Sequence, residues 1–330
     1  MRTTLIGVAL AAMTMAAPAL AEFPEKEIQG VIQWGAGGST DTVMRSVTPH
    51  AEEILGGKVV LTNRTGGVGA IAMKHVMARP SDGYTLLMGA ENPQMYKVLG
   101  LAETDYNDMV PINVLARGIP IFVANNDAPY DDMAGLIAHA EANPGAVKVG
   151  STGPGGLTSI VLAMLTNQVP LDFTRVPYDG DGPALTALQG GAIDVMPAVL
   201  GAAIEGIRAG RMKVIGLVDT ETHPLLPDVA PITETLPGLA DYLPWGPFFG
   251  VFVKDGTPDD IVATLQDAFA EAARSPEFEA LMADRGFSIM NASGAEAEAF
   301  LDAYRSTSSW IVHEAGFAKR SPEEFGIPKP

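Results

Sequence analysis

Three glycine-rich turns, each placed between an apolar run and an amphipathic run, constrain the fold of this chain most strongly. They span residues 35–41, 63–69 and 151–156. The order of an apolar strand, a glycine turn and a helix is typical of βαβ units, whose strands are parallel. Strand and helix patterns alternate from residue 28 to residue 218, and helical patterns dominate after residue 258. The sequence therefore predicts an α/β fold.

The predicted elements fall into two groups that we interpret as two lobes. We place residues 22–124 and 246–330 in lobe 1 and residues 125–245 in lobe 2. Strands near residues 119–124 and 250–253 carry the chain between them. Ligands of open α/β sheets bind beyond the carboxyl ends of the strands. Two such ends that face each other across a hinge would form a ligand cleft.

The first 21 residues have the features of a secretory signal peptide. Arg2 provides a positive charge, residues 5–17 are apolar, and Ala19-Leu20-Ala21 fits a cleavage site. The apolar run is shorter than the roughly 20 residues that a membrane-spanning helix needs. We therefore expect export and cleavage after Ala21.

Charge and composition exclude several classes of function. The chain has a net charge of −18, and nucleic-acid binding needs a basic face, so we expect no nucleic acid as a partner. It contains no cysteine, which excludes disulfides, thiolate catalysis and cysteine-ligated metals. Its five histidines show no metal-binding spacing. We predict neither a metal nor a cofactor.

The motifs of nucleotide-binding proteins and hydrolases are absent or weak. No glycine turn carries the lysine of a phosphate-binding P-loop, and no G-x-S-x-G nucleophile motif occurs. Gly67, Gly69 and Ala72 fit the pattern G-x-G-x-x-A of dinucleotide-binding folds, and Glu91 ends the next strand. Such a match is common by chance, and export argues against it. We predict that the protein is not an enzyme.

The turn at residues 35–41 can bind an anion. Its glycines allow the backbone to approach a ligand, and Ser39, Thr40 or Asp41 can cap the helix that follows. Free N–H groups and the dipole at a helix N-terminus favour a negative charge there. The alternative is an ordinary tight turn, which occurs throughout α/β proteins.

Six short motifs, in order along nearly the whole chain after residue 21, match those of one protein family. They contain Trp34, Gly37, Gly38, Asp41 and Arg45; Asn63, Arg64, Gly66 and Gly69; Pro80, Asp82, Gly83, Tyr84, Thr85, Leu86 and Leu87; Gly150, Ser151 and Gly153; Val176, Pro177, Tyr178 and Gly180; and Gly190, Gly191 and Asp194. The chain thereby resembles the solute-binding proteins of tripartite tricarboxylate transporters, the Bug family.

This resemblance implies a periplasmic-binding-protein-like fold, in which two α/β lobes joined by crossing strands close on a small carboxylate. It also implies location in the periplasm and delivery of the ligand to a carrier with one large and one small membrane subunit. We expect a monomer. Family ligands are held mainly by backbone N–H groups, hydroxyls and water. Two alternatives stay open, a ligand-sensing module of a two-component system and an exported enzyme acting on a carboxylate.

We predict that the ligand contacts the first turn, the turn at residues 151–156 and neighbouring strand ends. The predicted ligand-binding residues are Trp34, Gly35, Gly38, Ser39, Thr40, Asp41, Glu91, Asn92, Ser151, Thr152, Gly153, Gly155, Thr158, Tyr178, Asp179, Gly180, Pro197 and Ala198. Trp34 can pack on the ligand or in the core of its lobe, and the sequence does not decide between the two.

Acidic side chains distinguish this chain from the family pattern. Glu91 stands where a small or hydroxyl residue is common, Asp179 stands where lysine is common, and Asp181 lies nearby. Acids in the cleft would repel a polyanion. They favour a monocarboxylate, or a ligand with a cationic or hydrogen-bond-donating group, unless all three side chains point to solvent. The sequence leaves the identity of the carboxylate open.

Overall fold

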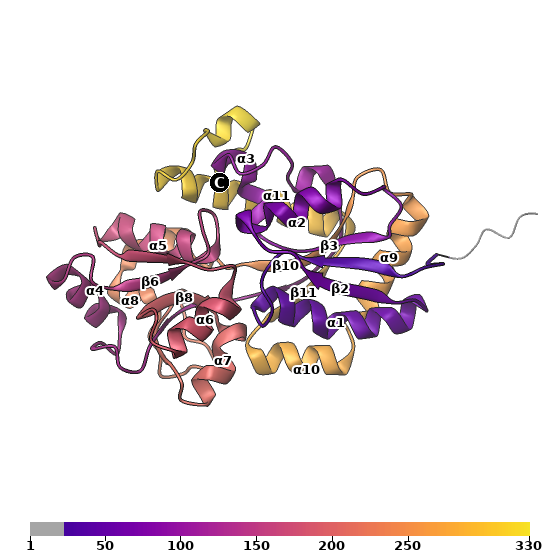
Figure 1. Ribbon diagram of the computed structural model, residues 1–330. Coiled ribbons are helices and arrows are strands. Elements are labelled where there is room, and N and C mark those ends of the chain that lie inside the picture. Colours follow the sequence, from indigo (N-terminus) through magenta and orange to yellow (C-terminus); the bar gives the residue numbers. More distant parts are fainter. Residues whose placement is uncertain (1–22) are drawn as a thin grey trace, which may run out of the picture.

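Two β-sheets form the centres of two α/β lobes in the computed structural model, which describes residues 23–330 (Figure 1). The first sheet has the strand order β11-β4-β10-β3-β1-β2, and the second has the order β7-β6-β8-β5-β9. The predicted two-lobed α/β fold is confirmed.

The bounds of the elements follow the alternation seen in the sequence. The strands are β1 (Ile28–Ile32), β2 (Val59–Asn63), β3 (Thr85–Ala90), β4 (Met109–Arg117), β5 (Pro120–Ala124), β6 (Lys148–Ser151), β7 (Thr174–Pro177), β8 (Val195–Val199), β9 (Lys213–Leu217), β10 (Phe248–Lys254) and β11 (Ser288–Ala292). The helices are α1 (Ser39–Leu55), α2 (Ala70–Met77), α3 (Tyr96–Leu99), α4 (Met133–Ala142), α5 (Leu157–Gln168), α6 (Asp181–Gln189), α7 (Leu200–Arg208), α8 (Ile232–Thr235), α9 (Asp259–Ala272), α10 (Pro276–Arg285) and α11 (Gly294–Glu314).

The first sheet has a parallel part and an antiparallel part. β1 pairs in parallel with β2 and β3, whereas β10 pairs antiparallel with β3 and β4. Helix α1 buries Val43, Val47 and Ala51 at helical spacing, and it packs against α9. It ends at Gly56, whose φ of 63° is the left-handed conformation found at many helix C-termini.

The second sheet is also mixed. β6 pairs in parallel with β7 and β8, and β5 lies antiparallel between β8 and β9. All residues of β5 and β8 are buried, as expected for the inner strands of a sheet that helices cover.

The chain crosses between the lobes at Gly118. The apolar residues on its two sides form β4 in the first sheet and β5 in the second. The N–H of Gly118 donates to the carbonyl oxygen of Pro247 at 2.8 Å, just before β10 returns the chain to the first sheet. Residues 120–124, which we predicted within lobe 1, therefore belong to the second sheet. The chain needs only Gly118, between two apolar runs, to pass from one sheet to the other. The predicted boundary of lobe 1, at residue 124, was therefore too late in the sequence.

The predicted signal peptide and its cleavage site fall within residues 1–22, outside the described residues. Among the helices between residues 23 and 330, none combines the length and the apolar character that crossing a membrane requires.

An aromatic stack fixes the carboxyl end of β3. The rings of Tyr106 and Phe252 are stacked with centroids 3.9 Å apart, and both side chains are buried. The hydroxyl of Tyr106 donates to the carbonyl oxygen of Ala90, the last residue of β3, at 2.6 Å. The core of the first lobe thus positions the loop that follows β3.

Replacing Phe252 by alanine should lower the free energy of unfolding by about 3–5 kcal/mol, because it leaves a cavity in the core. Urea unfolding followed by circular dichroism measures this loss. The control Val60→Ala, at a position that is 45% exposed, should change stability by less than about 1 kcal/mol. Equal losses in the two variants would contradict the assigned core.

Candidate functional site

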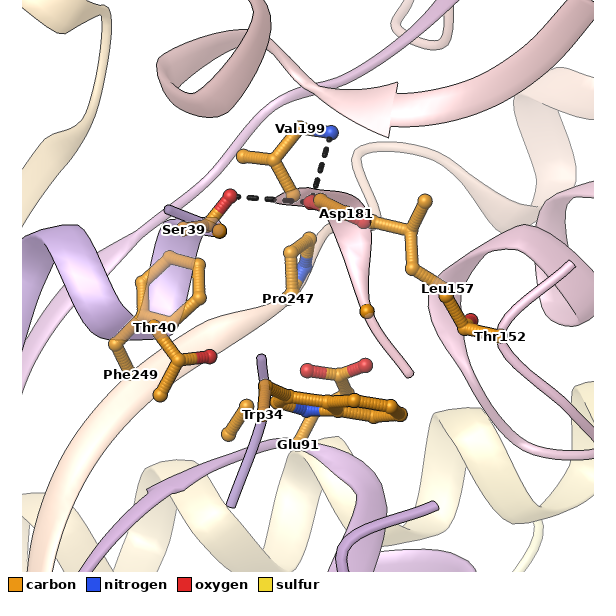
Figure 2. Close-up of a pocket in the computed structure, with 13 residues that line it drawn as sticks. Trp34, Ser39, Thr40, Glu91, Thr152, Leu157, Asp181, Val199, Pro247 and Phe249 are labelled. Carbon is orange, nitrogen blue, oxygen red and sulfur yellow. Dashed lines mark hydrogen bonds between the residues drawn. The ribbon is translucent and has the colours of Figure 1, made fainter. Parts of the chain in front are cut away.

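A cavity lies between the lobes, where the carboxyl ends of strands from both sheets meet (Figure 2). Its empty volume, part of which is open to solvent, is about 350 Å³. It is lined by Trp34, Gly38, Ser39, Thr40, Ala90, Glu91, Thr152, Leu157, Gly180, Asp181, Val199, Pro247 and Phe249. The segments after β1, β3 and β6 and the end of β8 all contribute, as expected for open α/β sheets.

The N-terminus of α1 forms one wall of the cavity. Gly38 is the N-cap residue, and no capping side chain is found there in the described chain. The N–H groups of the first turn are therefore available to a ligand. The hydroxyl of Thr40 points towards the cavity in Figure 2, whereas that of Ser39 donates to Oδ2 of Asp181 at 3.1 Å.

Asp41, a predicted ligand contact, lies outside the cavity lining and holds the first turn together. Its carboxylate accepts hydrogen bonds from the N–H of Gly37 at 3.0 Å and from Asn63 Nδ2 at 2.8 Å. It also pairs with Arg45 Nε at 2.8 Å, one helical turn later. The carboxylate fixes the shape of the turn, while the helix N-terminus faces the cavity.

The side-chain amide of Asn92, two residues after β3, is fully hydrogen-bonded. Its Oδ1 accepts from Gln33 Nε2 at 2.9 Å and from Trp34 Nε1 at 3.0 Å. Its Nδ2 donates to Glu91 Oε1 at 2.9 Å and to the carbonyl oxygen of Gly155 at 2.8 Å. One buried amide thus orients Trp34 and Glu91 and links the first lobe to the second.

Direct contacts between the lobes close the cavity. The N–H of Gly35 donates to the carbonyl oxygen of Asp179 at 3.0 Å. Gly182, near the start of α6, packs so tightly on the first turn that a Cβ there would lie 2.4 Å from the carbonyl oxygen of Ala36. Gly180 has a φ of 120°, which favours glycine, and it lies beside Trp34 and Gly35.

The turn between β6 and α5 uses most of its hydroxyls internally. Oγ1 of Thr158 accepts from the N–H of Thr152 at 2.7 Å and lies 3.0 Å from Thr152 Oγ1. Oγ of Ser151 lies 3.4 Å from Oγ of Ser159, which donates to the carbonyl oxygen of Gly153 at 2.7 Å. Of the three predicted hydroxyl contacts in this turn, the structure places only Thr152 at the cavity.

The predicted residues divide into those at the cavity and those that surround it. At the cavity lie Trp34, Gly38, Ser39, Thr40, Glu91, Thr152 and Gly180. Outside its lining lie Gly35, Asp41, Asn92, Ser151, Gly153, Gly155, Thr158, Tyr178, Asp179, Pro197 and Ala198. Strand β8 continues to Val199, so this residue reaches the cavity in place of Pro197 and Ala198.

The sequence prediction missed five apolar residues and one acid of the lining. The additional residues are Ala90, Leu157, Asp181, Val199, Pro247 and Phe249. Asp181 was noted as an acid near the cleft, and Leu157 could have been found as the first helical residue after a glycine turn. The others resemble ordinary core residues in the sequence, and nothing in their spacing separates them from the core.

Two carboxyl groups face the cavity, one from each lobe. Glu91 is only 2% exposed, and this burial raises its pKa to about 8, with a further contribution from the charge of Asp181. Burial also raises the pKa of Asp181 to about 6, although hydrogen bonds from Ser39 and from the N–H of Val199 oppose the shift. Between residues 23 and 330, no group of three acidic or histidine side chains is placed to hold a metal ion.

Glu91→Gln should stabilise the protein more at pH 8.5 than at pH 5. The pKa of Glu91 is about 8 when folded and near 4.5 when unfolded, so the folded state binds the extra proton between these values. Wild-type stability therefore falls as pH rises through this window, and the variant lacks this loss. The difference in free energy of unfolding between Glu91→Gln and wild type should therefore be larger at pH 8.5 than at pH 5 by a few kcal/mol, on the order of 1.4 kcal/mol for each pH unit in the window.

Urea unfolding of the variant and of wild type at the two pH values measures this difference. The contributions of other titrating groups are common to both proteins and cancel. Glu103→Gln, at an exposed position, serves as the control and should show no such growth. A difference between Glu91→Gln and wild type that is the same at both pH values would show that Glu91 is not buried as described.

Comparison with known proteins identifies a matching family model and several relatives. The model for the "Tripartite tricarboxylate transporter family receptor" matches residues 43–317. A protein from the tcbD-tcbE intergenic region of Pseudomonas sp. strain P51 is 31% identical over 317 residues, which cover 94% of this chain and 92% of the relative.

Solved structures agree with this assignment. The periplasmic binding protein BugD shares the fold, with a TM-score of 0.85 and 23% identity over 90% of this chain and 100% of BugD. MatC from Rhodopseudomonas palustris, solved with bound malate, has a TM-score of 0.82 and 27% identity over 88% of this chain and 100% of MatC. The resemblance seen in the six sequence motifs is confirmed, and the chain belongs to the tripartite tricarboxylate transporter receptor family, also called the Bug family.

Proposed function

We propose that this protein is a periplasmic solute-binding protein that captures a small carboxylate between its lobes. It acts as a monomer and delivers the ligand to a membrane carrier composed of one large and one small subunit. The observation that carries this proposal is the cavity between the lobes, which is lined by both of them and closed by direct contacts such as that from Gly35 to Asp179.

The helix termini at the cavity support a carboxylate as the ligand. Both α1 and α5 begin there, and neither has a capping side chain in the described chain. Their first N–H groups and dipoles favour an anion from opposite lobes. MatC, the relative with 27% identity, was solved with malate, a small dicarboxylate.

Location in the periplasm rests on the sequence of the first 21 residues and on the family. A positive residue, an apolar run and the small residues Ala19 and Ala21 fit a signal peptide. The structural relative BugD is itself a periplasmic binding protein. Partnership with the two membrane subunits is proposed from membership of the family.

A thermal-shift screen of monocarboxylates, dicarboxylates and tricarboxylates tests the proposed function. A ligand that binds only the folded protein should raise the melting temperature by several degrees at a hundredfold excess over its Kd. Calorimetry should then give a single site per chain. Binding of no carboxylate would contradict the proposal, and turnover of one would favour an exported enzyme instead.

Closure around the ligand predicts a strong effect of Gly182→Ala. The added Cβ would lie 2.4 Å from the carbonyl oxygen of Ala36 in the other lobe, so the lobes could not close fully. Affinity for any carboxylate found in the screen should fall about tenfold or more, which corresponds to about 1.4 kcal/mol. Calorimetry measures this loss, and the melting temperature without ligand should hardly change.

Gly190→Ala, at the other end of the same helix, is the matched control. A Cβ there would meet its nearest atom, the carbonyl oxygen of Thr186, at an ordinary 3.5 Å. Its affinity should equal that of wild type. If Gly182→Ala bound the ligand as tightly as Gly190→Ala, the closed arrangement would not be the binding form.

A further inference from the structure

The charged side chains that line the cavity are both acidic, which is unexpected for a site that takes an anion alone. They are Glu91 from the first lobe and Asp181 from the second. Arg45, the arginine of the first motif, is paired with Asp41 and lies outside the lining. A ligand carrying only carboxylates would bring further negative charge to these two acids without a cationic side chain in the lining to balance it.

Few groups of the protein compensate the charge of the Glu91 carboxylate. Asn92 donates to Oε1 at 2.9 Å, and the backbone N–H of Glu91 itself also bonds the carboxylate. Figure 2 shows the carboxylate of Glu91 directed into the cavity above the ring of Trp34. A carboxyl group that is 2% exposed and faces an internal space gains most from a donor or a positive charge on the ligand.

The donors near Glu91 are already used elsewhere. The hydroxyl of Tyr96 donates to the carbonyl oxygen of Val68 at 2.7 Å, and that of Tyr106 donates to Ala90. Trp34 Nε1 donates to Asn92. The protein therefore offers Glu91 only the amide of Asn92 and its own backbone N–H, and a proton or the ligand must supply the rest of the compensation.

Aromatic and apolar side chains complete the walls around the acids. Trp34 and Phe249 line the cavity together with Leu157, Val199 and Pro247. An ammonium group is attracted to the faces of aromatic rings and to carboxylates at the same time. The combination of a buried acid with an indole ring is suited to a cationic nitrogen.

We propose that the ligand carries a cationic nitrogen in addition to its carboxylate, and that Glu91 and Asp181 bind this nitrogen beside Trp34. The inference rests on the proposed function, since it names the class of carboxylate that the site takes. The ligand is a small zwitterion, such as an amino acid or a betaine. The carboxylate lies at the helix N-termini, where N–H groups are free.

The competing arrangement is a protonated Glu91 that donates to a ligand without a cation. The two arrangements predict opposite effects of pH. Ionisation of Glu91 strengthens binding of a cationic nitrogen and weakens binding of a carboxylate that needs its proton. The groups that face Glu91 are Asp181 and the buried phenols Tyr96, Tyr106 and Tyr304, and burial raises the pKa of each phenol well above its usual value.

Calorimetry with isosteric pairs decides between them. The pairs are glycine betaine with 3,3-dimethylbutanoate, 4-aminobutanoate with pentanoate, and glutamate with 2-methylglutarate, each differing by a cationic nitrogen. In at least one pair the cationic member should bind about tenfold more tightly or better, the effect of a charge-assisted contact. Its affinity should rise between pH 7 and pH 9.

Variants show whether Glu91 causes the preference for the cationic member of a pair. Glu91→Gln should reduce the preference within the pair to about threefold or less, and Asp181→Asn should reduce it in part. Glu103→Gln, which removes the same charge from the surface, should keep the full preference. Melting curves confirm that each variant is folded, and the comparison of pairs in wild type needs no variant at all.

The outcomes separate this inference from the proposed function. If carboxylates without nitrogen bind at least as tightly as their partners and lose affinity as pH rises, the inference is overturned and the carboxylate-binding function stands. If no member of any pair and no carboxylate of the wider screen binds, the proposed function itself is contradicted, and the inference falls with it.

Discussion

The buried amide of Asn92 is the interaction on which the arrangement of the cavity depends. An amide side chain has two N–H donors and a carbonyl oxygen with two acceptor positions, and Asn92 uses all four. Its acceptor side fixes Gln33 and Trp34 after β1, and its donor side fixes Glu91 and the carbonyl oxygen of Gly155. Asn92 therefore orients Trp34 and Glu91 in the cavity, and the same side chain holds the second lobe through Gly155.

Closure and selectivity come from the same contacts. The lobes meet through backbone groups at Gly35 and Asp179 and through the Ser39–Asp181 hydrogen bond, so bringing them together places Asp181 opposite Glu91. Burial disfavours the charged form of both side chains and raises the pKa of each. A ligand that compensates these charges stabilises the closed form, and one that adds to them opposes closure. The affinity of the site is thus tied to the charge of its ligand.

The sequence predicted the glycine turns, the α/β lobes and the family because these depend on local spacing and motifs. It did not predict β11, a short edge strand within a helical region, and it ended lobe 1 at residue 124, although the chain changes sheets at Gly118. Hydroxyls such as that of Thr158 could not be assigned, because a side chain bonded within its own turn looks identical in sequence to one that faces a ligand. Likewise, Phe249 and Val199 reach the cavity only through tertiary packing.

The number of protons exchanged on binding tests the central claim most directly. Calorimetric titration of the tightest zwitterionic ligand at pH 7, in buffers of different ionisation enthalpy, gives this number. Because the pKa of Glu91 is about 8, the free site holds most of one proton at this pH, and a cationic nitrogen should displace it. The account predicts release of a large part of one proton per ligand. Uptake of a proton, or no exchange, would contradict it.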